Sequence, residues 1–146
     1  MKSTQNRLRL CNCLIACLLV FIWGNSLLPA EISQAFSDWV KELLSASRGG
    51  SGSGSGLLRK IAHFTEFAAL GFFLGWRSGM LHKQKQFPFL WGAAAACVDE
   101  SIQLFTPGRS SQVSDVLLDS CGAAAGLFLL KLGYSIIKTV SNKMEE

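Results

Sequence analysis

Four long runs of apolar residues constrain the fold of this chain more than any other feature. They cover about 8–24, 60–80, 87–105 and 116–137. A helix needs roughly 20 mostly apolar residues to cross the hydrocarbon of a bilayer, and these runs lack the spaced apolar stripes of a soluble core. Only 16% of the 146 residues are charged, which is less than soluble domains usually carry. We therefore expect a single all-α domain over residues 1–146, an integral membrane bundle of four transmembrane helices.

The distribution of positive charge predicts the topology of such a bundle. A basic start precedes the first apolar run, as in a signal peptide or an uncleaved anchor, and we favour the anchor because no small-x-small cleavage site follows. With the N-terminus inside, nine Lys and Arg fall on the cytoplasmic side and five on the other. We therefore expect a multi-pass protein with both termini in the cytoplasm. The net charge of +4 is scattered between apolar runs, which argues against a nucleic-acid partner.

Two further segments lie between the first and second apolar runs. In about 31–46, apolar residues recur at spacings of three and four with polar residues between them, which predicts an amphipathic helix that lies along the membrane surface or packs on the bundle. Residues 49–56 alternate glycine and serine, a composition typical of a flexible linker. So regular a tract could be native or an engineered replacement of a native loop, and we assign no function to it.

Ionisable residues of three predicted spans gather at one membrane face. His63 and Glu66 lie early in the second span and share a helical face, because they are three residues apart. The third span runs the other way, and its polar residues come late: Asp99, Glu100 and Gln103. Asp115 and Asp119 then open the fourth span at that same end, the outer one in the expected topology. One shared site explains this coincidence best.

Two interpretations of these residues stay open. In the structural one, Lys60 and Arg109 neutralise the acids. In the functional one, the surplus of carboxylates recruits a cation or a ligand. The candidates then fall into overlapping sets. Catalytic candidates are His63, Glu66, Asp99 and Glu100; binding candidates are Lys60, Gln103, Arg109, Asp115 and Asp119; candidate ligands of a divalent metal are Glu66, Asp99 and Glu100. We assign no cofactor.

Glycines spaced by four residues mark two helix faces. They form Gly71-x-x-x-Gly75-x-x-x-Gly79 in the second span and Gly122-x-x-x-Gly126 in the fourth. Small residues at this spacing let helix backbones approach closely in a membrane. We expect the second and fourth spans to touch, and the same faces could also support a homo-oligomer.

The polar motifs resemble the VanZ-like family. The resemblance rests on Lys60-x-x-His63-Phe64-x-Glu66-Phe67, on Asp99-Glu100-x-x-Gln103-x-Phe105-x-Pro107-Gly108-Arg109, and on Asp115-x-x-x-Asp119-x-x-Gly122. It implies a small protein of the bacterial cell membrane, related to one linked to resistance to the glycopeptide teicoplanin. It does not imply a reaction.

Three functions are compatible with these features. The first is a non-enzymatic envelope protein whose outward site binds membrane lipids through their headgroups, or a cell-wall precursor. The second is an intramembrane metal-dependent hydrolase of a lipid-linked phosphate or amide, with His63 or Glu66 as base. The third is proton or solute transport, which the apolar inner halves of the spans argue against.

Overall fold

The computed structural model describes residues 2–45, 55–81 and 87–144, and five helices account for most of them. The bounds are α1 Lys2–Ser26, α2 Ala30–Ser45, α3 Ser55–Met80, α4 Pro88–Leu104 and α5 Val113–Met144. Within these ranges no strand occurs, so the predicted all-α class is confirmed.

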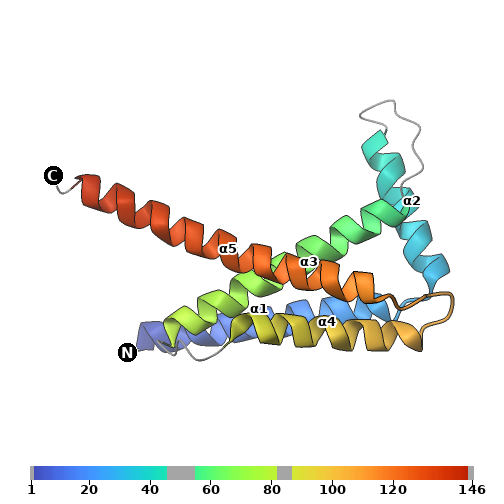
Figure 1. The fold of residues 1–146 in the computed structure, drawn as a ribbon, viewed down its shortest axis with the longest axis horizontal. Coiled ribbons are helices and arrows are strands. Elements are labelled where there is room, and N and C mark those ends of the chain that lie inside the picture. Colours follow the sequence, from blue (N-terminus) through green and yellow to red (C-terminus); the bar gives the residue numbers. More distant parts are fainter. Residues whose placement is uncertain (1, 46–54, 82–86, 145–146) are drawn as a thin grey trace.

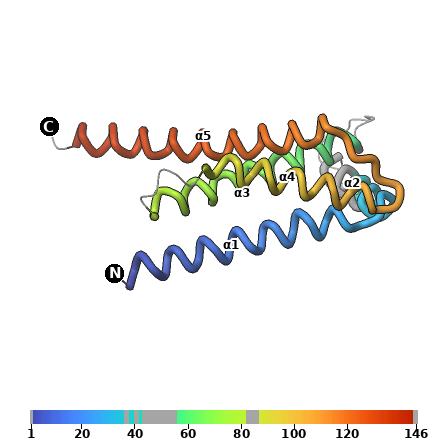
Figure 2. The backbone as a smooth tube through the Cα atoms, turned by 60° about the horizontal axis from the view of Figure 1, so that its bottom comes forward, coloured from blue at the N-terminus to red at the C-terminus, as the bar shows by residue number. Residues whose placement is uncertain are grey.

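Four of the helices run lengthwise and the fifth stands across one end. Helices α1, α3, α4 and α5 alternate in direction, as short connections between neighbours require, and both termini lie at the same end of the molecule (Figures 1 and 2). Helix α2 lies at the opposite end, beside the start of α3 and the loop between α4 and α5. We call this the α2 end. The polar residues singled out in the sequence all lie toward this end: Arg109 in the loop between α4 and α5, and the others in the half of their helix that is nearest to it.

Two of the four predicted spans meet the length and composition of a membrane helix. These are α1 and α5, and only 11% and 22% of their most apolar segments are buried inside the structure. Core helices of soluble proteins are mostly buried, so these low fractions favour helices that face lipid. Helix α4 has 17 residues, and α3 has 26 but carries Arg59 and Lys60 near its start and Arg77 near its end.

The segment between α1 and α3 agrees with the prediction in part. The amphipathic segment is a helix, α2, and its bounds lie within one residue of those expected. The predicted linker 49–56 is too long, because α3 already begins at Ser55 and its first turn includes Gly56. Residues 49–54 lie outside the described residues.

Glycines bring α3 and α5 together, as expected. A methyl group at Gly71 would overlap the backbone oxygen of Ala123, and one at Gly126 would overlap that of Ala68. At Gly122 it would lie 2.5 Å from the backbone oxygen of Phe64. The two helices therefore touch backbone to backbone. These glycines pack within one chain, so self-association would need another surface and stays a prediction.

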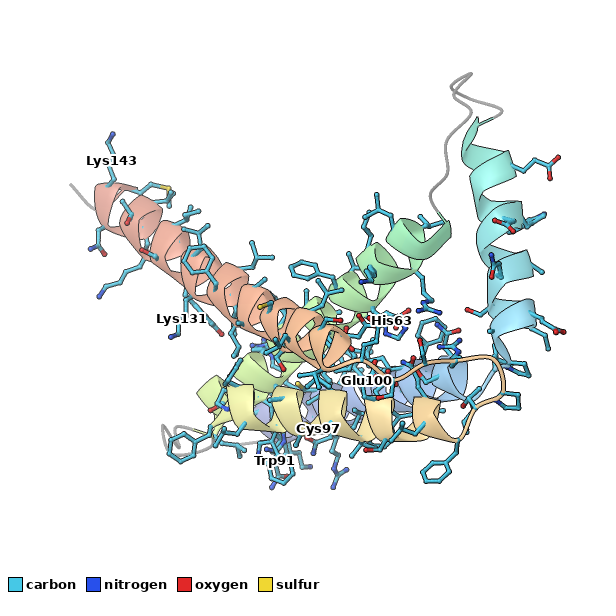
Figure 3. All side chains as sticks on the ribbon, turned by 45° about the vertical axis from the view of Figure 1, so that its right-hand side comes forward. His63, Trp91, Cys97, Glu100, Lys131 and Lys143 are labelled. Carbon is cyan, nitrogen blue, oxygen red and sulfur yellow. The ribbon has the colours of Figure 1, made fainter. Side chains whose placement is uncertain are left out.

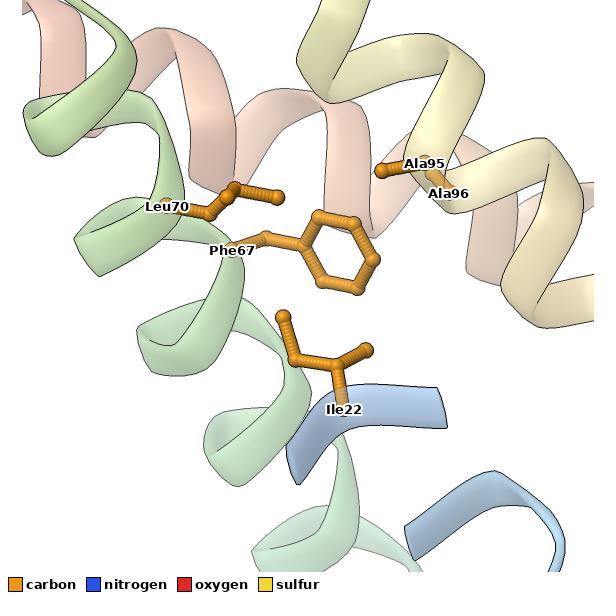
Figure 4. Close-up of a cluster of buried hydrophobic side chains, with 5 residues drawn as sticks. All are labelled: Ile22, Phe67, Leu70, Ala95 and Ala96. Carbon is orange, nitrogen blue, oxygen red and sulfur yellow. The ribbon is translucent and has the colours of Figure 1, made fainter. Parts of the chain in front are cut away.

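The interior combines a small apolar cluster with many polar groups. The cluster joins Ile22 of α1 to Phe67 and Leu70 of α3 and to Ala95 and Ala96 of α4 (Figure 4). Equally buried are seven polar residues: Ser26, His63, Asp99, Glu100, Gln103, Thr106 and Asp119. Large apolar side chains meanwhile point outward along α1, α4 and α5, such as Trp91 at 67% exposure and Ile137 at 67%. Polar groups inside and apolar groups outside suit a bilayer as the surrounding solvent.

Candidate functional site

Three helices bring titratable side chains together in the interior near the α2 end. Helix α3 contributes His63, α4 contributes Asp99 and Glu100, and α5 contributes Asp119. His63 and Glu100 lie where these helices meet (Figure 3). Gly122 lets α5 approach α3 closely at this point. It lies one turn after Asp119 and packs on the backbone of Phe64, the neighbour of His63.

His63, Asp99 and Asp119 form the centre of the site, which we call the His–Asp cluster. The Nδ1 atom of His63 lies 3.8 Å from Oδ2 of Asp99 and 3.9 Å from Oδ2 of Asp119. One ligand atom of each residue lies within 4.8 Å of the others, and all three residues are buried. This set differs from the predicted metal ligands, because it contains Asp99 but has His63 and Asp119 in place of Glu66 and Glu100.

Hydrogen bonds fix the Asp99 carboxylate from one side. Gln103, one turn later on α4, donates from Nε2 to Oδ2 of Asp99 at 2.9 Å. The same amide nitrogen lies 3.4 Å from the hydroxyl of Ser26 at the end of α1. The other carboxylate oxygen, Oδ1 of Asp99, is buried without a hydrogen-bond partner among the described residues. Gln103 therefore orients Asp99, and the direct binding role expected for it stays a prediction.

The loop between α4 and α5 is fastened to α1 and holds Glu100. Thr106 donates from its hydroxyl to the carbonyl of Ser26 at 2.9 Å. The backbone N–H of Gln112 donates to Oε2 of Glu100 at 3.1 Å. Gly108 adopts a φ of +74°, a left-handed conformation that glycine adopts without a steric penalty. The Pro107-Gly108-Arg109 motif thus closes the site by returning the chain to α5.

The two basic residues predicted for the site have different roles. Lys60 pairs with Asp115 at 3.5 Å, at the partly exposed edge. Arg109 instead donates to the backbone carbonyls of Leu28 and Asn25, at 3.1 and 3.0 Å, and so fastens the loop to the end of α1. Burial lowers the pKa of its guanidinium, and nearby Arg59 lowers it further, against the opposing effect of Asp99 and Glu100. A guanidinium nevertheless stays charged in proteins.

A small cavity adjoins the His–Asp cluster, a larger one lies beside the starts of α2 and α3, and Arg59 lines both. The smaller has a volume of about 10 Å³ and is lined by His63, Glu100 and Asp119 with Lys60 and Arg59. The larger, about 580 Å³, lies between the end of α1, the start of α2 and the start of α3. Its lining is mostly apolar, with Val20, Phe21, Leu28, Ile32 and Leu58, and it reaches Arg59 and Glu66. We call it the α1–α2–α3 pocket.

The structure thus separates the predicted residues into groups that the sequence could not distinguish. Glu66 faces the α1–α2–α3 pocket, while Asp115 stays at the edge with Lys60. Sequence reasoning missed Arg59 and Ser26 as parts of the site. Arg59 directly precedes Lys60 and looked like one more residue of a basic helix start. Ser26 ends an apolar run, and no local pattern marks it.

Comparisons with known proteins place the chain in a family. No match was found among curated proteins, nor among solved structures. The sequence model of the VanZ/LLP1 family matches residues 11–136, which include every residue of the site described above. Together with the two apolar helices α1 and α5, this match supports a membrane protein. The chain belongs to the VanZ/LLP1 family.

Proposed function

We propose that this protein binds an amphiphile with an anionic headgroup, a membrane phospholipid or a lipid-linked cell-wall precursor, at its α2 end. The observation that carries the proposal is the position of Arg59. Its side chain lines both the apolar α1–α2–α3 pocket and the small polar cavity of the His–Asp cluster. A molecule with an apolar body and a charged head needs such a junction of the two environments.

The apolar part of the ligand occupies the α1–α2–α3 pocket in this proposal. Its volume of about 580 Å³ falls in the usual range for small-molecule sites, roughly 300–1,000 Å³. Phe21 and Leu28 of this lining are themselves strongly exposed, at 60% and 41%, so the pocket is open to whatever surrounds α1. In a membrane the surroundings are lipid acyl chains, and an acyl chain can enter the pocket laterally from the bilayer.

The headgroup binds to Arg59, with Lys60 beside it. The planar guanidinium matches the two oxygens of a phosphate, which makes arginine a preferred phosphate ligand. Lys60 is about half exposed, at 48%, and its pairing with Asp115 is at the edge, so it can turn toward a ligand at little cost. Arg109 was also predicted to bind, and its Nε and Nη2 donate to two backbone carbonyls. Its Nη1 has no hydrogen-bond partner among the described residues, so a role in binding stays a prediction.

The proposal includes a membrane topology. All four lengthwise helices span the bilayer, with α3 and α4 shielded by α1 and α5, and α2 lies at the outer surface. The α2 end then faces outward and the termini face the cytoplasm. The excess of Lys and Arg toward the ends that carry the termini supports this orientation.

The intramembrane hydrolase remains a second candidate because one observation favours it. Histidine and aspartate side chains that can hold a cation lie beside the proposed headgroup position. A metal there could polarise a phosphate or amide, with His63 or Glu66 as base. Turnover of a lipid-linked phosphate or amide by purified protein, lost in Asp99→Asn, would support this candidate over simple binding.

Native mass spectrometry of the detergent-solubilised protein tests headgroup binding. We expect phosphatidylglycerol to be retained by the wild-type protein more than phosphatidylcholine. Its retention should fall about tenfold in Arg59→Gln, a loss of about 1.4 kcal/mol, which is close to the lower end of the range for a charged hydrogen bond. Lys143→Gln removes the same unit of charge at the far end of α5 and should leave retention unchanged. Equal loss in both variants would mean that phosphatidylglycerol binds by net charge and not at this site.

The link to teicoplanin resistance extends the same proposal to cells. A host that expresses the wild-type chain should tolerate more teicoplanin than one that expresses Arg59→Gln, at equal protein abundance. The minimum inhibitory concentration measures this difference. Equal tolerance in the two hosts would mean that resistance does not depend on the headgroup site.

A further inference from the structure

We propose that His63, Asp99 and Asp119 together bind one divalent transition-metal ion in the interior of the helix bundle. This site goes beyond headgroup binding and does not rest on it. It also differs from the set of acids that the sequence suggested, because its ligands come from three helices.

The distances within the His–Asp cluster fit a bridging ion better than direct contacts. The separations of 3.8 and 3.9 Å between His63 Nδ1 and the two carboxylate oxygens are too long for hydrogen bonds. Two ligands that are each about 2.1 Å from one ion lie roughly 3.0–4.2 Å apart, depending on the angle between them. The third separation, between the two carboxylates, is at most 4.8 Å. If the two carboxylates shift by a few tenths of an ångström, all three ligand atoms can lie about 2.1 Å from a single ion.

Unpartnered atoms point to a missing ligand. His63 Nδ1, Asp99 Oδ1 and Asp119 Oδ1 are each buried without a hydrogen-bond partner among the described residues. Their side chains are only 9%, 0% and 2% exposed. Native proteins rarely leave buried polar atoms unsatisfied, and several such atoms on neighbouring side chains of one cluster indicate an ion or a water that completes them.

The surplus of buried negative charge also favours a bound cation. Asp99, Glu100 and Asp119 place three carboxylates in the interior. Of the two guanidinium groups nearby, that of Arg109 donates to backbone carbonyls, and Arg59 lines the adjoining cavity. Buried carboxylates need a counter-charge. A divalent cation supplies two positive charges at the centre of the cluster, where no described lysine or arginine side chain is fully buried.

The donor set and the cavity select the type of ion. Imidazole nitrogen suits first-row transition metals, and carboxylate oxygen suits harder ions. One histidine with two aspartates therefore favours Mn²⁺ or Zn²⁺ over Ca²⁺, which prefers six to eight oxygen ligands. The adjoining cavity of about 10 Å³ has room for a single small ion or water.

The surroundings already contain the groups that orient metal ligands. Gln103 holds Asp99 through the bond at 2.9 Å, and Ser26 supports Gln103 from α1. Outer groups of this kind fix ligand orientation, and their loss typically weakens metal binding about 10–100-fold. Gln103 is thus a positioning residue for the site.

Metal binding is measured directly on the full chain, purified with a tag free of histidine. After treatment with a chelator and dialysis against Mn²⁺, Zn²⁺ or Ca²⁺, elemental analysis should find one Mn²⁺ or Zn²⁺ per chain and no stoichiometric Ca²⁺. Asp119→Asn should weaken binding at least about tenfold. The matched control is Asp115→Asn, the same change one turn earlier on α5 at a residue outside the cluster, and it should bind as the wild type does.

A spectroscopic measurement keeps the proposal testable where Asp119→Asn fails to fold. The chain has two histidines, so in a His82→Gln protein a nitrogen coupling to bound Mn²⁺ in pulsed paramagnetic resonance identifies His63. Absence of bound metal in the wild type, absence of the nitrogen coupling, equal losses in Asp115→Asn and Asp119→Asn, or Ca²⁺ binding as tight as that of Mn²⁺ would each overturn the proposal.

Discussion

Among the described glycines, Gly126 is the one at which an added methyl group would come closest to another helix, and enlarging it should separate α5 from α3. A methyl group there would overlap the backbone oxygen of Ala68 and lie 2.8 Å from the carbonyl carbon of Ala68 and from the backbone nitrogen of Phe72. All three atoms belong to the backbone of α3, so no side-chain rotation can relieve the overlap. Gly126→Ala should therefore destabilise the protein.

The size of the effect follows from a comparison with Gly133 on the same helix. A methyl group at Gly133 would meet no neighbouring heavy atom within 4 Å among the described residues. Both substitutions gain the same helix propensity, about 1 kcal/mol. This gain cancels in the difference between the variants. What remains is the overpacking at Gly126, about 1–3 kcal/mol.

Reversible unfolding in mixed micelles measures this difference. Each variant is titrated from a mild detergent into a denaturing one, and helix content by circular dichroism gives the free energy of unfolding. Gly126→Ala should be less stable than Gly133→Ala by about 1–3 kcal/mol. Equal stabilities would refute the backbone-to-backbone packing of α3 on α5 and, with it, the approach that brings Asp119 to His63.

Two further substitutions probe the core and the loop closure, each against a matched control in the same unfolding assay. Phe67→Ala should cost about 3–5 kcal/mol, because Phe67 is fully buried, whereas Phe128→Ala at 64% exposure should change the free energy of unfolding little; similar losses would contradict the packing in Figure 4. Thr106→Val removes the donor to the buried carbonyl of Ser26 and should cost about 1–3 kcal/mol. Thr139→Val removes a comparable bond to Ser135 on an exposed face and should be nearly neutral, and the opposite order would argue against the fastening of the loop to α1.

Patterns within single segments were enough to predict the helices. Continuous apolar runs predicted four helices, and the three- and four-residue spacing of apolar residues in 31–46 predicted the amphipathic one, because helix periodicity is a local property of the chain. The contact between α3 and α5 was also predictable, since Gly71 and Gly122 mark their own helix faces. The start of α3 was not, because Ser55 and Gly56 have low helix propensity and join the helix only as its first turn.

The composition of the site was predictable, but the partners within it were not. Buried acids in apolar helices are costly, so Asp99 and Asp119 stood out on sequence alone. Which acid meets His63 depends on the rotation of α5 about its own axis, which the packing of Gly122 on Phe64 fixes. The role of Arg109 depends on where α1 ends, since the carbonyls of Asn25 and Leu28 accept its bonds.

The proposed metal site requires that α3, α4 and α5 bring His63, Asp99 and Asp119 into one buried cluster. A double-mutant cycle with His63→Gln and Asp119→Asn, measured as free energies of unfolding with chelator present, tests it most directly. Contact across the helices predicts a coupling energy of about 0.5–3 kcal/mol. Effects that add to within about 0.3 kcal/mol, as for residues with no shared environment, would contradict the cluster.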